Sequence, residues 1–143
     1  MTERLYLTYK DNAKAALPWG GFHITIIGSG NKTSFDQLRN TSFVKWKFSD
    51  RPVARLEIWK GVWTIVFNSK SIDKLADELR GLRFTSVKGP RSRTSWHISL
   101  NGVDKESAKG LFQRFVRNDG RPSWHLTRCI ENPKGVFTWN RVK

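Results

Sequence analysis

Two short segments of this chain share one pattern, and that pattern restricts the folds that the chain can adopt. Residues 22–27 (FHITII) and 96–100 (WHISL) alternate apolar side chains with a histidine and, two positions later, a threonine or serine. Such alternation is typical of a β-strand that is buried on one face, because side chains i and i+2 leave a strand on the same side. The residues expected together on the exposed faces are His23, Thr25, His97 and Ser99.

The third histidine of the chain, His125, also has a threonine two residues later. Only 22 of the 143 residues are serine or threonine, so three matches among three histidines are improbable by chance. The motif alone allows any two of the three histidines to form a pair. Context favours His23 with His97, because each of these two motifs is followed by a glycine-containing break and a capped helix. The strand around His125 follows the second helix and is expected at the outer part of its sheet, with His125 half-exposed at the rim.

Imidazole and hydroxyl groups in this arrangement are what the cleavage of a phosphodiester without a metal requires. One group must take a proton from the nucleophile and another must give one to the leaving oxygen. Imidazole, with an ordinary pKa of about 6.5, can do either near neutral pH. The hydroxyls can donate to the non-bridging oxygens, which gain negative charge in the transition state. Two such strands on either side of one phosphate would therefore supply a complete acid–base pair.

With these two motifs the chain resembles the two-histidine (2H) phosphoesterase superfamily, whose signature is two His-x-Thr/Ser strands in a bilobal α/β domain. That superfamily includes 2′,3′-cyclic phosphodiesterases, LigT-like proteins, viral 2′,5′-phosphodiesterases and phage nucleases that destroy cyclic oligonucleotide signals. The resemblance rests on the two motifs, on their spacing and on the duplicated context, and in architecture it covers nearly the whole chain. Two positions depart from the pattern: Trp96 stands where a proline precedes the second histidine, and Ser99 replaces a threonine.

The resemblance implies an α+β fold in a single domain over residues 1–143. Each of two lobes would have an antiparallel sheet with a helix on the outside, and the histidine strands would face each other across a central cleft. The catalytic residues would be His23, Thr25, His97 and Ser99. The activity would be metal-independent hydrolysis of a phosphodiester in an RNA-like ligand, with no cofactor. A cyclic phosphate on an RNA end, a 2′,5′ linkage and a cyclic oligonucleotide signal are all open as substrates.

The net charge of +14, from 26 Lys and Arg against 12 Asp and Glu, favours a polyanionic partner, most often nucleic acid. The simplest alternative is a basic chain that its charge keeps soluble. Another is a non-catalytic RNA-binding module, which needs basic and aromatic side chains but no imidazole pair. A compact basic phosphoesterase suggests a viral or phage enzyme in the host cytoplasm. The candidate substrate-binding residues are Tyr6, Tyr9, Trp19, Lys88, Arg91 and Arg93, with Trp59 and Trp63 as further base-stacking candidates.

The remaining composition narrows the setting of the protein. The single cysteine, Cys129, excludes an internal disulfide and a cysteine-based zinc site, and we expect it to be inert packing. A reducing, cytoplasmic compartment follows as the default. No histidine or cysteine cluster has metal-ligand spacing. No apolar run approaches the roughly 18 residues that span a bilayer, so a membrane is not an expected partner. The oligomeric state is open.

The rest of the chain predicts a mixed, β-rich structure. Aromatic and β-branched runs indicate strands, helical spacing of leucine and isoleucine indicates helices, and a Lys-Gly pair at 60–61 indicates a hairpin turn. Asp104 is placed to cap the helix that follows the second motif. Loops are expected at 12–21 and 83–94. The further strands are expected at 4–9, 43–48, 53–59, 62–67, 123–130 and 136–141, and the helices at 34–39, 71–82 and from 104 to about 117.

Overall fold

The computed structural model describes residues 2–9, 22–40, 46, 48, 53–89, 96–117, 124–131, 133–134 and 137–141. Over these residues the fold is α+β, as predicted, with two antiparallel sheets and two α-helices. The elements in chain order are β1 (Thr2–Tyr9), β2 (His23–Ile27), the 3-10 helix η1 (Phe35–Asn40), β3 (Ala54–Trp59), β4 (Val62–Phe67), α2 (Lys70–Gly81), β5 (Trp96–Ser99), α3 (Lys105–Val116), β6 (Trp124–Glu131) and β7 (Phe137–Arg141).

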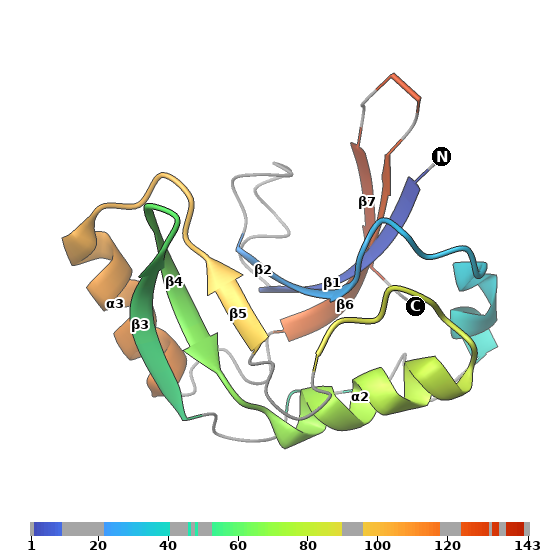
Figure 1. Ribbon diagram of the computed structural model, residues 1–143, viewed down its shortest axis with the longest axis horizontal. Coiled ribbons are helices and arrows are strands. Elements are labelled where there is room, and N and C mark those ends of the chain that lie inside the picture. The colour runs from blue at the N-terminus through green and yellow to red at the C-terminus, as the bar shows by residue number, and fades with distance from the viewer. Residues whose placement is uncertain are drawn as a thin grey trace.

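The two motif strands belong to different sheets. The larger sheet has the strand order β2-β1-β6-β7 and the smaller sheet the order β3-β4-β5, and every hydrogen-bonded pair is antiparallel. Each motif strand is therefore the outermost strand on one side of its sheet. The strands β2 and β5 contact each other, and Figure 1 shows them next to one another near the middle of the molecule. The two sheets thus meet along the strands that carry the motifs.

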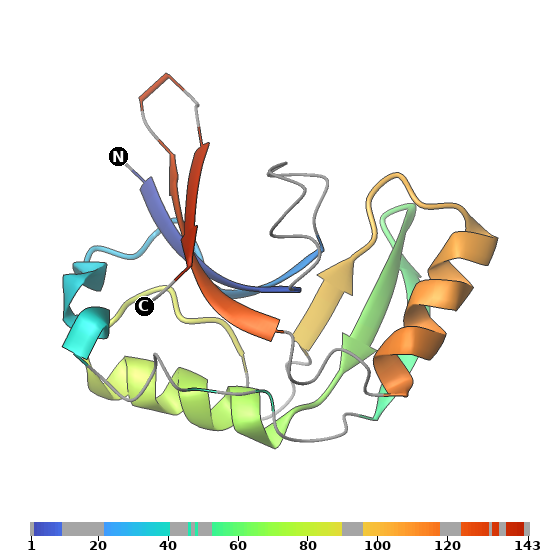
Figure 2. The same ribbon diagram turned by 180° about the vertical axis from the view of Figure 1, so that it is seen from behind.

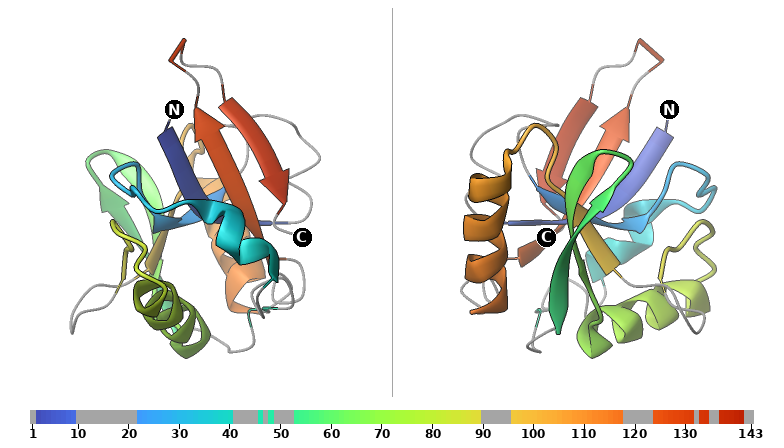
Figure 3. Two further views of the ribbon diagram at one scale, coloured as in Figure 1. Left: turned by 90° about the vertical axis from the view of Figure 1, so that its right-hand side faces the viewer. Right: turned by 60° about the vertical axis from the view of Figure 1, so that its left-hand side comes forward.

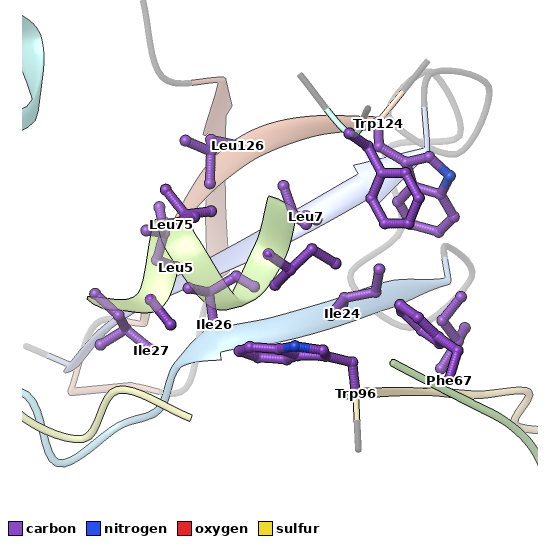
Figure 4. Close-up of a cluster of buried hydrophobic side chains, with 14 of the residues drawn as sticks. Leu5, Leu7, Ile24, Ile26, Ile27, Phe67, Leu75, Trp96, Trp124 and Leu126 are labelled. Atoms are coloured by element: carbon purple, nitrogen blue, oxygen red, sulfur yellow. The ribbon is translucent and has the colours of Figure 1, made fainter. Parts of the chain in front are cut away.

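Both sheets contribute to one buried core. Ile24 of β2 and Ile98 of β5 are at most 2 % exposed and lie in the same cluster of buried side chains, as their alternation with polar residues predicts. Leu75 of α2 lies among the core residues of the larger sheet (Figure 4). On the smaller sheet, α3 packs against β3 and β4, and the ring of Phe115 is centred 4.8 Å from that of Phe67. Figures 2 and 3 show α3 (orange) beside the smaller sheet and α2 (yellow-green) on the side of the larger sheet. Both helices therefore cover core faces and leave the histidine faces uncovered by α-helix.

The helices and the hairpin form for the local reasons that the sequence indicates. The Ser69 hydroxyl accepts a hydrogen bond from the backbone N–H of Ile72 at the start of α2, and the Asp104 carboxylate accepts one from Ser107 at the start of α3. The predicted hairpin turn has Lys60 and Gly61 with positive φ angles of 50° and 79°, as a tight turn between antiparallel strands requires. The predicted helix at 34–39 is instead the 3-10 helix η1.

Strand β2 contains an irregularity that the alternation of its sequence does not predict. Its pairing with β1 shifts between Leu5 and Tyr6, so that Ile26 is an extra residue on the β2 side. A bulge of this kind breaks the strict alternation of faces. Ile26 and Ile27 are both fully buried for this reason, while His23 and Thr25 keep their common face.

One expectation about strand order is wrong. The strand that follows the second helix, β6, lies inside the larger sheet between β1 and β7, and not at its outer part. The reason is that the chain passes to the larger sheet after α3. There β6 pairs along its whole length with the N-terminal strand, from Thr2 opposite Glu131 to Tyr9 opposite Trp124. Of the strand predicted at 43–48, Trp46 and Phe48 are described and neither is in a strand. The predicted loop at 12–21 lies outside the described residues.

Candidate functional site

The first motif lies on the face of the larger sheet that is turned away from the core. His23 and Thr25 are half-buried there, whereas Ile24 between them is fully buried on the other face. The ring of Tyr6, on the neighbouring strand, stacks on the imidazole of His23 with ring centroids 4.3 Å apart and planes 26° apart. Tyr6 itself is 5 % exposed, and this burial raises the pKa of its phenol, which a hydrogen bond from Arg4 opposes. Tyr6 therefore holds one face of the His23 ring.

The second motif lies on the corresponding face of the smaller sheet. His97 is exposed and Ser99 half-buried, while Trp96 and Ile98 point into the core. Atoms packed around the inner side of the His97 ring withdraw it from water, and this partial burial lowers its pKa. The positive charge of Lys88 lowers that pKa further. The imidazole of His97 is thus held in its neutral form, which can accept a proton, at neutral pH.

The two histidines lie on strands that contact each other. The side chains that alternate with them, Ile24 and Ile98, enter one common core. Because successive side chains of a strand leave on opposite faces, His23 and His97 both leave on the side away from that core. The structure thus brings the two strands that carry the first two motifs into contact, with each histidine on the face of its sheet opposite to the core.

Lys88 lies between the two motif strands. Its backbone N–H donates to the carbonyl of Ile26 on β2, at 2.7 Å, and its side chain lies over Gly28, just beyond the end of β2. Its charge acts on His97 of β5. The guanidinium of Arg80 donates to the carbonyl oxygens of Val87, Lys88 and Gly89, at 2.9 to 3.5 Å, and so holds this segment in place. Lys88 is therefore positioned to attract an anion bound between the motifs.

A hydrogen-bonded tryptophan stands beside His97. The Trp59 ring is centred 5.2 Å from the His97 ring and is 40 % exposed, although it is a large apolar side chain. Its indole N–H donates to Glu57 at 2.8 Å, and Arg55 donates to the other oxygen of that carboxylate at 2.6 Å. These bonds lower the pKa of Glu57, the bond from Arg55 most strongly. Trp59 is thus an exposed aromatic surface held at a defined angle next to a motif histidine.

The third histidine shares the face of the first. In the larger sheet His23 stands opposite Thr8, and Thr8 stands opposite His125, so the three residues form one row across β2, β1 and β6. His125 is half-exposed, as predicted, despite the interior position of its strand. On the same face, the hydroxyl oxygens of Thr8 and Thr127 are 2.6 Å apart, and both residues are buried.

The structure describes the side chains of two further residues that the sequence analysis considers, Trp63 and Cys129. Trp63 is partly buried against the core, on the opposite face of its sheet from Trp59. Burial raises the pKa of the Cys129 thiol to about 11, so this side chain stays protonated at neutral pH and is a poor nucleophile. Tyr9 lies at the end of β1, where the structure describes only its backbone. The candidates outside the described residues are Trp19, Arg91 and Arg93.

Sequence reasoning missed the groups that support the motifs. Glu57 and Arg80 act through hydrogen bonds to Trp59 and to the segment 87–89. Thr8 stands between two histidines from distant parts of the chain. The only local signal was the Arg-x-Glu-x-Trp alternation of β3, which places Arg55, Glu57 and Trp59 on one face. The position of Thr8 follows from strand pairing over long sequence distances, whereas Arg80 of α2 reaches carbonyl oxygens that lie only seven to nine positions later.

Comparison of the chain with protein families, with curated proteins and with solved structures finds no match. Among the residues that the structure describes, no three histidine, cysteine, aspartate or glutamate side chains are grouped so that they could hold a metal ion. Within the same residues no helix is long and apolar enough to cross a membrane.

Proposed function

We propose that this protein is a metal-independent phosphodiesterase of the two-histidine type, which hydrolyses a phosphodiester in an RNA-like ligand. The observation that carries the proposal is the contact between β2 and β5, the outermost strands of two sheets, with His23 and His97 both turned away from the shared core. A phosphate bound over this contact would lie between two imidazoles. The bilobal form with a central cleft, expected of the superfamily, belongs to this proposal.

The environments of the two histidines suggest separate roles. His97, neutral at neutral pH, would take the proton from a water or a ribose 2′-hydroxyl as that oxygen bonds to phosphorus. His23, its ring held by Tyr6, would give a proton to the leaving oxygen as the bond from phosphorus to that oxygen breaks. Thr25 and Ser99 would donate hydrogen bonds to the non-bridging oxygens.

Two neighbouring groups support a nucleotide as the ligand. Lys88, whose charge acts on His97 and whose side chain lies over Gly28 just beyond β2, supplies a positive charge for a phosphate. Trp59 offers an exposed ring on which a nucleobase could stack, and such stacking tolerates any base. The net charge of +14 favours an oligonucleotide over an uncharged or cationic substrate.

The proposal is tested by incubating the protein, with excess EDTA, with nucleoside 2′,3′-cyclic phosphates, RNA ending in a cyclic phosphate, 2′,5′-oligoadenylates and cyclic dinucleotides, and by identifying the products by mass. Wild type should hydrolyse at least one of them. His23→Ala and His97→Ala should each abolish turnover, and the double variant should lose little more, because the two groups act as a unit. His125→Ala, which removes neither of the two proposed acid–base groups, should keep at least about a tenth of the wild-type kcat.

Two results would contradict this assignment. Turnover that stops on chelation and returns with a divalent ion would exclude the metal-independent mechanism. A folded His125→Ala variant without activity, beside an active His97→Ala variant, would show that the third motif supplies the second histidine. Tight oligonucleotide binding with no turnover of any substrate would instead support the non-catalytic RNA-binding module.

A further inference from the structure

The row of residues across the larger sheet continues the proposed site in one direction. His23, Thr8 and His125 stand at directly opposed positions on β2, β1 and β6, so their side chains leave on one face. His125 lies two strands from His23, a separation of about 9–10 Å between backbones, since neighbouring strands lie about 4.8 Å apart. A ligand bound at His23 therefore needs only to extend over β1 to reach His125.

One residue of this row, Thr8, lies between the two histidines. It is 7 % exposed, and its hydroxyl oxygen is 2.6 Å from that of Thr127, so each hydroxyl is within hydrogen-bond distance of the other. Thr127 and Tyr6 lie on the next row of the same face, and Tyr6 stacks on the ring of His23. Because Thr8 is buried, the residues of this row with more exposed surface are the half-buried His23 and His125. The imidazole of His125 thus lies on the same face as that of His23, with a buried, hydrogen-bonded threonine between them.

We propose that His125 binds a second phosphate of the substrate, the one next to the phosphodiester that is cleaved, so that the substrate is a linear or cyclic oligonucleotide with at least two phosphates and not a nucleoside cyclic monophosphate. This inference rests on the proposed function for the position of the first phosphate. A histidine suits the second position because an imidazole N–H donates a hydrogen bond to a phosphate oxygen, and the ring can also carry a positive charge. A substrate with one phosphate would leave His125 without a ligand group and would gain nothing from it.

The test compares ligands that differ by one phosphate. A dinucleoside monophosphate (ApA) and the same compound with a further phosphate at its 5′ or its 3′ end (pApA, ApAp), each in 3′,5′- and 2′,5′-linked form, are titrated into the His97→Ala protein. This background prevents turnover if the proposed mechanism holds, so that dissociation constants can be measured. The additional phosphate should improve affinity about tenfold or more in one of the two positions, as expected for a hydrogen bond to a charged group.

The contribution of His125 is then obtained from the ratio of the affinity for the ligand with the additional phosphate to the affinity for the ligand without it. His125→Ala should reduce that ratio to near one, and His125→Arg, which restores a charged donor, should recover it. Lys134→Ala, which removes a charge from the exposed turn after β6, should leave the ratio as it was. Circular dichroism and the melting temperature of each variant show whether it is folded, and the His125→Arg variant keeps the test valid if His125→Ala does not fold.

The outcomes separate this inference from the proposed function. A ratio near one in the His125-containing protein, or a ratio that His125→Ala leaves unchanged, would overturn the second phosphate site, even if the wild-type protein hydrolyses a substrate. A ratio that depends on His125, in a protein that hydrolyses none of the ligands, would support the site and overturn the phosphodiesterase.

Discussion

At the scale of the residue, the hydroxyl groups of the motifs are the simplest test of where a phosphate binds. Thr25 is half-buried and lies on the same face of β2 as His23. Thr25→Val keeps the shape and removes the donor, and should lower kcat by about 10²–10³-fold, as the loss of one oxyanion donor does elsewhere. Thr25→Ser, which keeps the donor, should have a small effect. If steady-state kinetics showed near-normal kcat for Thr25→Val, the phosphate would have to bind elsewhere.

The interaction between Lys88 and His97 gives a second test at the same scale. Burial and the charge of Lys88 both lower the pKa of His97. Lys88→Gln removes the like charge and leaves the burial, so the pKa of His97 should rise but stay below its ordinary value. His97 would then become protonated at a higher pH. The acidic limb of the plot of kcat/KM against pH should therefore shift to higher pH.

This shift can be followed directly, because the chain has only three histidines. An NMR titration of the imidazole C–H resonances, assigned with single His→Ala variants, reports each pKa. Lys134→Gln, in an exposed turn at the far end of β6, is the matched control and should leave the titration of His97 unchanged. A His97 pKa that is the same with and without Lys88 would mean that the ammonium group lies elsewhere in solution.

At the scale of the element, the segment that leads into the second motif is held by unusually close packing. Gly89 has a φ of 87°, and a Cβ at this position would collide with the ring of Trp96. Trp96 is 2 % exposed, and its indole N–H donates to Asp73 of α2 at 2.7 Å. A glycine thus allows the backbone to pass directly over the residue that precedes His97.

We expect Gly89→Ala to lower the free energy of unfolding by more than about 2 kcal/mol. A left-handed backbone costs a residue with a Cβ about 1–2 kcal/mol, and overpacking against a buried ring costs about 1–3 kcal/mol. The matched control is Gly110→Ala in α3, where a Cβ meets nothing within 4 Å. That change should stabilise the protein by about 0.5–1 kcal/mol. Urea unfolding of the two variants measures both, and equal effects would show that the 89–96 contact is loose.

At the scale of the whole molecule, the charge of +14 should control ligand capture more than chemistry. Phosphate binding by Lys and Arg releases counterions, with a slope of about −0.7 per phosphate for single strands. For a ligand with one or two phosphates, KM should therefore rise roughly three- to sevenfold between about 50 and 200 mM salt, while kcat changes little. Steady-state kinetics against salt tests this, with sucrose as an uncharged control. A KM that does not change with salt concentration would mean that the excess positive charge contributes to solubility and not to ligand binding.

Much of this arrangement could be read from the sequence, because it depends on local patterns. Alternation with period two predicted both motif strands and the faces on which His23 and His97 lie, and helical spacing predicted α2 and α3, the latter with Asp104 as its capping residue. The turn at Lys60 and Gly61 follows from backbone geometry at those two residues alone. Each of these features is decided by neighbours within a few positions along the chain.

The tertiary structure alone decided which of these pieces meet. Strand order depends on pairings between residues more than a hundred positions apart, and alternation is the same for an outer and an inner strand. For this reason the position of β6 was predicted wrongly, and the row that joins His23 to His125 could not be foreseen. The contact of Trp59 with His97, and the effect of Lys88 on that histidine, likewise exist only because strands and a loop that are separate in the sequence come together in the fold.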